Sequence, residues 1–274
     1  MKYTILSKSL ITCVFLILSG TLAAQPMCNF RVEEPDLAFK DHEKLTYVVT
    51  YTWGLFNTDV GEAEFEIYKI RDFPIEYRIV INAKTYKFYD KFFMVRDYYE
   101  ARFSIPDLRS IYFYRNVSEG GYLIQNTYNF DWERNVINAS IKVNQRPEKN
   151  IEMQMENCTL DILTYFYYLR NLNFDDAYPG KAYSLSIALD GDVFNIKCRF
   201  LGREKKKIKA MKRKVDCLKF AVEVIAGSVF KGDESVTLWV SDDKNHIPLE
   251  IESPIIVGKV KARIAKYDNL KYDF

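Results

Sequence analysis

The clearest pattern along the chain is an alternation of apolar and polar side chains with a period of two residues. Residues 45–53 place Leu, Tyr, Val, Tyr and Trp at every second position, mostly with threonines between them, and residues 62–67 alternate glutamates with Ala, Phe and Ile. This alternation is typical of strands with one buried and one solvated face. It predicts an antiparallel sheet whose second face is exposed in this region.

Further strand-like stretches follow, separated by short segments that contain turn-forming Pro, Gly or Asp. They form one group before residue 145 and another after residue 180, without the strand and helix alternation of a parallel doubly wound fold. We therefore predict a mainly β fold, with a single antiparallel sheet that curls or closes like a barrel, in one domain over residues 25–274. The additional strands are expected at 77–83, 92–103, 110–117, 122–130, 135–143, 183–189, 193–201, 215–224, 235–240, 247–251 and 257–267.

One stretch departs from the period of two: residues 157–171, NCTLDILTYFYYLRN, carry apolar or aromatic side chains on nearly every helical face. A helix without a polar face must be covered on most sides. We therefore predict one buried helix over about 159–170, packed on the concave side of the sheet. Asn157 or Thr159 is the expected N-cap.

The polar side chains of this helix are Asp161, Thr164 and Arg170. Asp161 and Arg170 are nine residues apart, so at about 100° per residue they lie on opposite faces and cannot pair with each other. Each needs a partner elsewhere. Two interpretations stay open: capping electrostatics with a guanidinium that reaches solvent, or polar groups that face a ligand.

The N-terminus has the features of a secretory signal peptide over residues 1–24. Lys2 and Lys8 precede a short apolar run and the small residues 20–24, which predicts cleavage after Ala24. Residues 25–274 contain no run of 18 apolar residues, so we predict no transmembrane segment there and a location in the periplasm or at the outer-membrane periphery.

Removal of the signal peptide also changes the charge balance. The full chain has 39 basic and 37 acidic residues, and loss of Lys2 and Lys8 leaves 37 of each. A neutral chain does not favour nucleic acid as a partner.

The cysteines and histidines limit the chemistry. Cys28, Cys158, Cys198 and Cys217 remain in an oxidising compartment, where they could form three full sets of pairs or stay as buried thiols. Cys198 and Cys217 lie on two predicted strands close in sequence and are the candidate disulfide. The chain has two histidines and neither a CxxC pair nor a glycine-rich phosphate motif, so we predict no metal site, no cofactor and no catalytic residue.

The segment 203–214, REKKKIKAMKRK, is the strongest charge feature and predicts a protruding hairpin. One interpretation is that its lysines are solvated and discourage pairing between sheet edges. The other is contact with anionic lipid headgroups or a phosphorylated glycan. Its basic residues are Arg203, Lys205, Lys206, Lys207, Lys209, Lys212, Arg213 and Lys214.

Aromatic residues are abundant, with 20 Tyr and 19 Phe, and several are adjacent in strand-like stretches. Adjacent side chains on a strand point to opposite faces, so either the helix or a ligand covers the second face. Aromatic rings in a concave sheet can hold acyl chains or stack on sugars. The candidates for lining such a cleft are Trp53, Tyr165, Tyr168, Arg170 and Trp239.

Three blocks resemble an exported bacterial family known as domain of unknown function 3108. The helix resembles the family's central signature in its D-x-x-T-x-x-Y-x-x-R arrangement, and residues 47–65 and 238–264 resemble its opening hairpin and closing strands. The signal peptide also resembles those of exported Bacteroidota proteins. The resemblance implies export to the envelope, a largely β domain and no established activity. The basic residues 212–214 depart from the family's usual glycine-containing turn.

These observations favour a non-catalytic envelope protein that binds an amphipathic or lipidic ligand in an aromatic-lined cleft. One alternative is an envelope glycan binder or carbohydrate-active enzyme, and an enzyme of this kind needs two carboxylates about 5–10 Å apart in an open cleft. Another is a structural partner of an envelope protein assembly, which would present a flat exposed aromatic patch.

Overall fold

The computed structural model describes residues 30–156, 158–222, 236–255 and 257–274. The predicted signal peptide 1–24 and Cys28 lie outside these residues, as do the ends of two predicted strands at 223–224 and 235. Within the described part, none of the helices has the length and apolar character needed to cross a bilayer.

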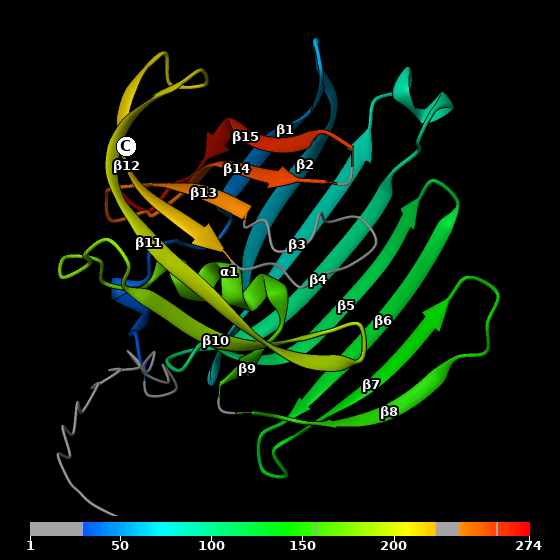
Figure 1. Cartoon of the computed structure of the whole chain (residues 1–274). Helices are drawn as coiled ribbons and strands as arrows, with labels where there is room; N and C mark the ends of the chain where they lie inside the picture. The colour runs from blue at the N-terminus through cyan, green and yellow to red at the C-terminus, as the bar shows by residue number, and fades with distance from the viewer. Residues whose placement is uncertain (1–29, 157, 223–235, 256) are drawn as a thin grey trace, which may run out of the picture.

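The described strands form one sheet in the order β8-β7-β6-β5-β4-β3-β2-β1-β15-β14-β13-β12-β11-β10-β9 (Figure 1). Neighbouring strands are antiparallel, apart from the parallel pair of β9 and β10. The strands are β1 (Lys44–Trp53), β2 (Phe56–Asp72), β3 (Ile75–Thr85), β4 (Arg96–Ser104), β5 (Arg109–Glu119), β6 (Tyr122–Asp131), β7 (Val136–Val143), β8 (Lys149–Gln154), β9 (Thr159–Leu160), β10 (Ala182–Leu189), β11 (Asp192–Ile208), β12 (Arg213–Val222), β13 (Val236–Ser241), β14 (Pro248–Pro254) and β15 (Lys259–Asp268).

The two edge strands of this sheet are neighbours in sequence. β8 ends at Gln154 and β9 begins at Thr159, and a chain extends at most about 3.6 Å per residue, so the two edges lie within about 18 Å of each other. β8 and β9 do not pair with each other, and the sheet is therefore strongly curled but not closed. The predicted barrel-like antiparallel sheet is confirmed.

The turn between β10 and β11 lies against strands on the other side of the curl. Gly191 has a φ of +85°, and a Cβ at this position would lie 2.6 Å from Cδ1 of Ile141 and 3.1 Å from Cδ1 of Ile151. Only glycine fits both the left-handed backbone and this close approach to β7 and β8. The contact helps to keep the two halves of the sheet together.

The helix α1 (Ile162–Arg170) lies on the concave side of the sheet and packs against β4 and β10 (Figure 1). The predicted buried helix is confirmed, but its predicted N-cap is wrong. Thr159 belongs to the short strand β9, and the side chain of Asp161 caps the helix by accepting hydrogen bonds from the backbone N–H groups of Leu163 and Thr164. Two 3₁₀ helices, η1 (Glu34–Asp36) and η2 (Tyr89–Lys91), complete the described elements.

Aromatic rings from the helix and the sheet form much of the core. Phe39 contacts the rings of Tyr77, Phe103 and Tyr167 edge-on, at centroid distances between 5.0 and 6.1 Å. Edge-to-face contact is a favoured geometry for buried rings. The enclosed helix thus accounts for many of the rings that the sequence places on the second face of the sheet.

The predicted disulfide between Cys198 and Cys217 is wrong, since both are free buried thiols. In the register of β11 and β12, Cys198 lies opposite Val222, whereas Cys217 lies opposite Glu204. Six residues along a strand correspond to about 20 Å, and a disulfide requires Cα atoms within about 7 Å. Cys158 is disulfide-bonded.

Candidate functional site

Asp161 and Thr164 hold the start of α1 and are fully buried. Asp161 Oδ1 accepts the two helix N–H groups at 2.9 Å, and Oδ2 accepts the hydroxyls of Ser110 and Thr164, each at 2.6 Å. Burial raises the pKa of the Asp161 carboxyl, and these hydrogen bonds act in the opposite direction. All of these contacts are internal, so the capping interpretation accounts for this end of the helix.

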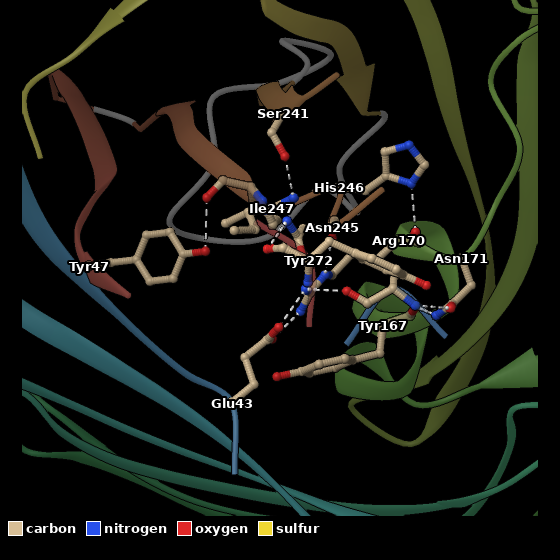
Figure 2. A network of polar contacts seen from close by, with 12 residues as sticks. Glu43, Tyr47, Tyr167, Arg170, Asn171, Ser241, Asn245, His246, Ile247 and Tyr272 are labelled. Carbon is tan, nitrogen blue, oxygen red and sulfur yellow. Dashed lines mark hydrogen bonds and ion pairs between the residues drawn. The ribbon is translucent and has the colours of Figure 1, made fainter. Parts of the chain in front are cut away.

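Arg170, at the other end of α1, forms a buried ion pair with Glu43 (Figure 2). The two side chains are 2% and 0% exposed. Nη1 and Nη2 donate to the two Glu43 oxygens at 2.5 and 2.9 Å, while Nε donates to the Asn245 carbonyl at 3.1 Å and Nη2 to the Ala38 carbonyl at 3.2 Å. Arg170 therefore neither reaches solvent nor presents its guanidinium to a ligand, contrary to both interpretations of the sequence.

The network around Arg170 joins distant parts of the chain (Figure 2). The Asn245 side chain exchanges two hydrogen bonds, both of 3.0 Å, with the backbone of Tyr272. His246 Nδ1 donates to the Arg170 carbonyl at 2.7 Å, and burial lowers the pKa of this histidine. The helix end, the segment before β1, the β13–β14 turn and the C-terminal segment thus meet at one structural node.

The other predicted lining residues do not share a cleft. Tyr165 and Tyr168 are buried in the core, where Tyr168 packs on Phe30. Trp239 is buried against the β11–β12 hairpin, and its indole N–H donates to Glu204 at 2.6 Å. Trp53 is exposed at the β1–β2 turn. With Arg170 in its ion pair, the structure therefore distributes the five candidates over four separate places.

A groove of about 430 Å³ lies elsewhere, between the tip of the β11–β12 hairpin and strands β1, β2, β14 and β15. Val48, Arg263 and Glu250 form a row across β1, β15 and β14, because they are register partners. The volume lies within the usual range for small-molecule sites. The lining comprises the apolar Val48, Ile208, Ala210, Leu249, Ile264 and Ala265, the basic Lys207, Lys209, Lys212 and Arg263, and the acidic Asp59 and Glu250.

The acidic side chains of this groove are already paired. Asp59 accepts hydrogen bonds from Arg263 and Thr50, both at 2.7 Å. Glu250 lies 3.2 Å from the ammonium of Lys206 and 3.9 Å from that of Lys261. By contrast, the three lysines of the hairpin tip that line the groove have no carboxylate within 4 Å among the described residues. The groove therefore carries an unbalanced positive charge above apolar side chains.

The remaining basic residues of the hairpin are mostly held in place. Arg203 pairs with Asp242 at 3.0 Å and Lys205 with Asp216 at 3.1 Å. Lys206 lies 3.7 Å above the Trp239 ring, and Arg213 lies 5.7 Å above the Phe274 ring. The predicted hairpin is present, with its turn between Ile208 and Arg213. Its solvated charge is concentrated at the tip.

The buried carboxyl of Asp97 on β4, beside the half-buried Glu119 on β5, escaped the sequence analysis. Asp97 is 8% exposed and accepts the Ser118 N–H at 3.1 Å. Burial, and then the charge of Glu119, raise the pKa of Asp97 to about 7. A buried carboxyl whose pKa is raised by an adjacent carboxylate differs from the separated acids of a glycosidase. No local spacing marks the pair, because strand register alone brings them together.

Comparison with known proteins defines the family. A solved structure, the beta-barrel-like protein of domain of unknown function DUF1849 from Brucella abortus, matches 86% of this chain and 100% of its own length, with 11% sequence identity and a TM-score of 0.56. This likeness concerns the fold alone. No curated protein matches the chain. The model of DUF3108, described as a protein of unknown function, matches residues 46–265. The chain therefore belongs to the DUF3108 family.

Proposed function

We propose that this protein is an exported, non-catalytic protein of the cell envelope that binds an anionic amphipathic ligand in the groove beneath the β11–β12 hairpin. The observation that carries the proposal is the pairing of an apolar wall with three lysines that have no acidic partner among the described residues. A ligand with an acyl chain and a phosphate or carboxylate headgroup matches both, because the chain can pack on the apolar wall while the headgroup binds the lysines. Export follows from the predicted signal peptide over residues 1–24.

The two parts of the groove contribute different energies. Burial of an acyl chain against the half-buried Val48, Ala210 and Ala265 contributes about 25 cal/mol per Å² of apolar surface removed from water. Each lysine near an anionic headgroup adds about 1 kcal/mol. Nε of Arg263 is buried and has no hydrogen-bond partner, so the groove also contains an unsatisfied donor. Affinity should therefore depend on both chain length and headgroup charge.

The charge dependence can be measured with dodecyl phosphate and dodecanol as probes in calorimetric titrations. We expect dodecyl phosphate to bind more tightly than dodecanol. Replacing Lys207, Lys209 and Lys212 together with Gln should weaken dodecyl phosphate binding about 10- to 100-fold, with little effect on dodecanol. Lys214→Gln is the matched control, since Lys214 lies on the same hairpin but does not line the groove. Equal loss in the control, or no loss in the triple variant, would contradict the proposal.

The apolar part of the groove has its own test. Ala210 lies at the hairpin tip and lines the groove, so Ala210→Trp should fill the groove while leaving every charge in place. We expect this variant to lose binding of both probes and to unfold at the same temperature as the wild type. If dodecyl phosphate still binds to Ala210→Trp with wild-type affinity, the ligand site is not this groove.

A further inference from the structure

Large apolar side chains are exposed at the tips of several loops that lie at the same end of the strands. We call this end of the sheet the docking edge. At this edge β1 ends and β2 begins, β3 leads through the η2 loop into β4, and β15 begins opposite the end of β1 (Figure 1). Leu55 is fully exposed and Phe92 is 76% exposed. Trp53, Phe56, Phe88 and Phe93 are also exposed there. Isolated exposed apolar residues are ordinary, whereas a cluster of this kind marks an interaction surface.

Contacts between the loops make this edge one surface. Thr58 on β2 shares a hydrogen bond with the hydroxyl of Tyr89 in the η2 loop. The Phe93 ring lies so close to Gly120, in the β5–β6 turn, that a Cβ there would come within 2.4 Å of it. The β14–β15 turn approaches β1, since a Cβ on Gly258 would lie 2.3 Å from the Thr52 carbonyl oxygen. The apolar tips are thus held side by side.

The charges among these tips are predominantly positive. Asp90, the acidic residue of the η2 loop, is bound to Arg96 at 2.6 Å and to the Thr85 hydroxyl at 2.5 Å. Lys87 and Lys91 flank it and have no carboxylate within 4 Å in the part of the chain that the structure describes. Aromatic side chains beside unpaired lysines suit the boundary between headgroups and acyl chains of an anionic bilayer.

The loops at the other ends of the strands, which we call the opposite edge, differ. Ile105 and Leu108 in the β4–β5 turn are buried, and Phe73 in the β2–β3 turn is 93% exposed without other exposed rings in its turn. The apolar tips are therefore a property of one edge and not of the turns in general. Because the exposed rings project from the tips of several neighbouring loops, each ring can enter a bilayer without the matching pocket that a protein partner would have to provide.

We propose that this edge docks on the surface of a bilayer containing anionic lipid, with the rings of the β1–β2 and β3–β4 tips inserted at the headgroup boundary. The proposal does not depend on ligand binding in the groove. Docking would hold the protein at a membrane surface through apolar insertion reinforced by Lys87 and Lys91.

Flotation with phosphatidylcholine vesicles containing phosphatidylglycerol tests the docking. The wild type should float with these vesicles, and the double variant Leu55→Glu/Phe92→Glu should reduce the bound fraction at least tenfold. Phe73→Glu, at the opposite edge, is the matched control and should bind like the wild type. All replaced side chains are exposed, so thermal unfolding should not change.

Quenching by brominated phosphatidylglycerol reports insertion directly, because Trp53 lies at the docking edge, whereas Trp239 is buried and Trp132 follows β6 at the other end of the strands. We expect vesicle-dependent quenching that disappears in Trp53→Phe. The proposal is overturned if the wild type stays unbound, if the double variant floats like the wild type, or if Phe73→Glu loses binding equally. Self-association abolished by Leu55→Glu/Phe92→Glu, without vesicle binding, would instead show that the edge contacts a second copy.

Discussion

Replacing Arg170 with methionine should lower the free energy of unfolding by about 3–5 kcal/mol, because the substitution leaves the Glu43 carboxylate buried without its charged partner. The loss includes the hydrogen bonds to the Asn245 and Ala38 carbonyls. For a chain of this size, each kcal/mol corresponds to about 2–4 °C in the unfolding midpoint. Thermal unfolding followed by circular dichroism should therefore show a midpoint about 10 °C lower than that of the wild type. Urea unfolding would measure the loss in free energy directly.

A matched control is available on the surface. Arg134 pairs with Glu152 at 2.7 Å, but both side chains are largely exposed, so Arg134→Met should cost at most about 1 kcal/mol. The double variant Arg170→Met/Glu43→Leu removes both buried charges and should recover much of the stability lost in the single variant. If Arg170→Met costs no more than Arg134→Met, the ion pair is not the structural node inferred from its burial.

The helix shows how far local reasoning extends. The sequence alone indicated that Asp161 and Arg170 lie on opposite faces and need partners elsewhere, and this is what the structure contains. It could not identify those partners, because Ser110 and Glu43 lie 51 and 127 residues away. Burial of the helix was predictable from its lack of a polar face. The hydrogen-bond or ion-pair partner of each polar side chain instead depends on the sheet that encloses the helix.

The basic hairpin shows the limit set by strand register. Its charge pattern predicted the hairpin, but the apolar floor of the groove beneath it comes from Val48 on the first strand and Ala265 on the last strand, which come close together only when β1 pairs with β15. Register also explains the incorrect disulfide. β11 is 17 residues long and contains a bulge near Leu201, so two cysteines close in sequence lie far apart along the hairpin.

Asp97→Asn should remove a pH dependence of stability that amounts to as much as about 4 kcal/mol. In the folded protein, burial and the neighbouring Glu119 raise the pKa of Asp97 to about 7, while the unfolded chain releases this proton near pH 4. Between these pH values the folded state binds more protons than the unfolded state. Stability is therefore greatest near pH 4 for this group and falls as pH rises toward 7, by at most about 1.4 kcal/mol per pH unit.

Urea unfolding at intervals from pH 4 to pH 8 measures this slope. Asn is isosteric and neutral and can still accept the Ser118 N–H, so the variant should be more stable than the wild type at pH 8 and similar to it near pH 4. Glu119→Gln removes the second charge but not the burial, and should reduce the slope without abolishing it. Asp192→Asn, at the exposed first residue of β11, should leave the slope unchanged. A wild-type slope that persists in Asp97→Asn would mean that a group other than Asp97 takes up the proton, and it would contradict the assignment of the raised pKa to this buried carboxyl.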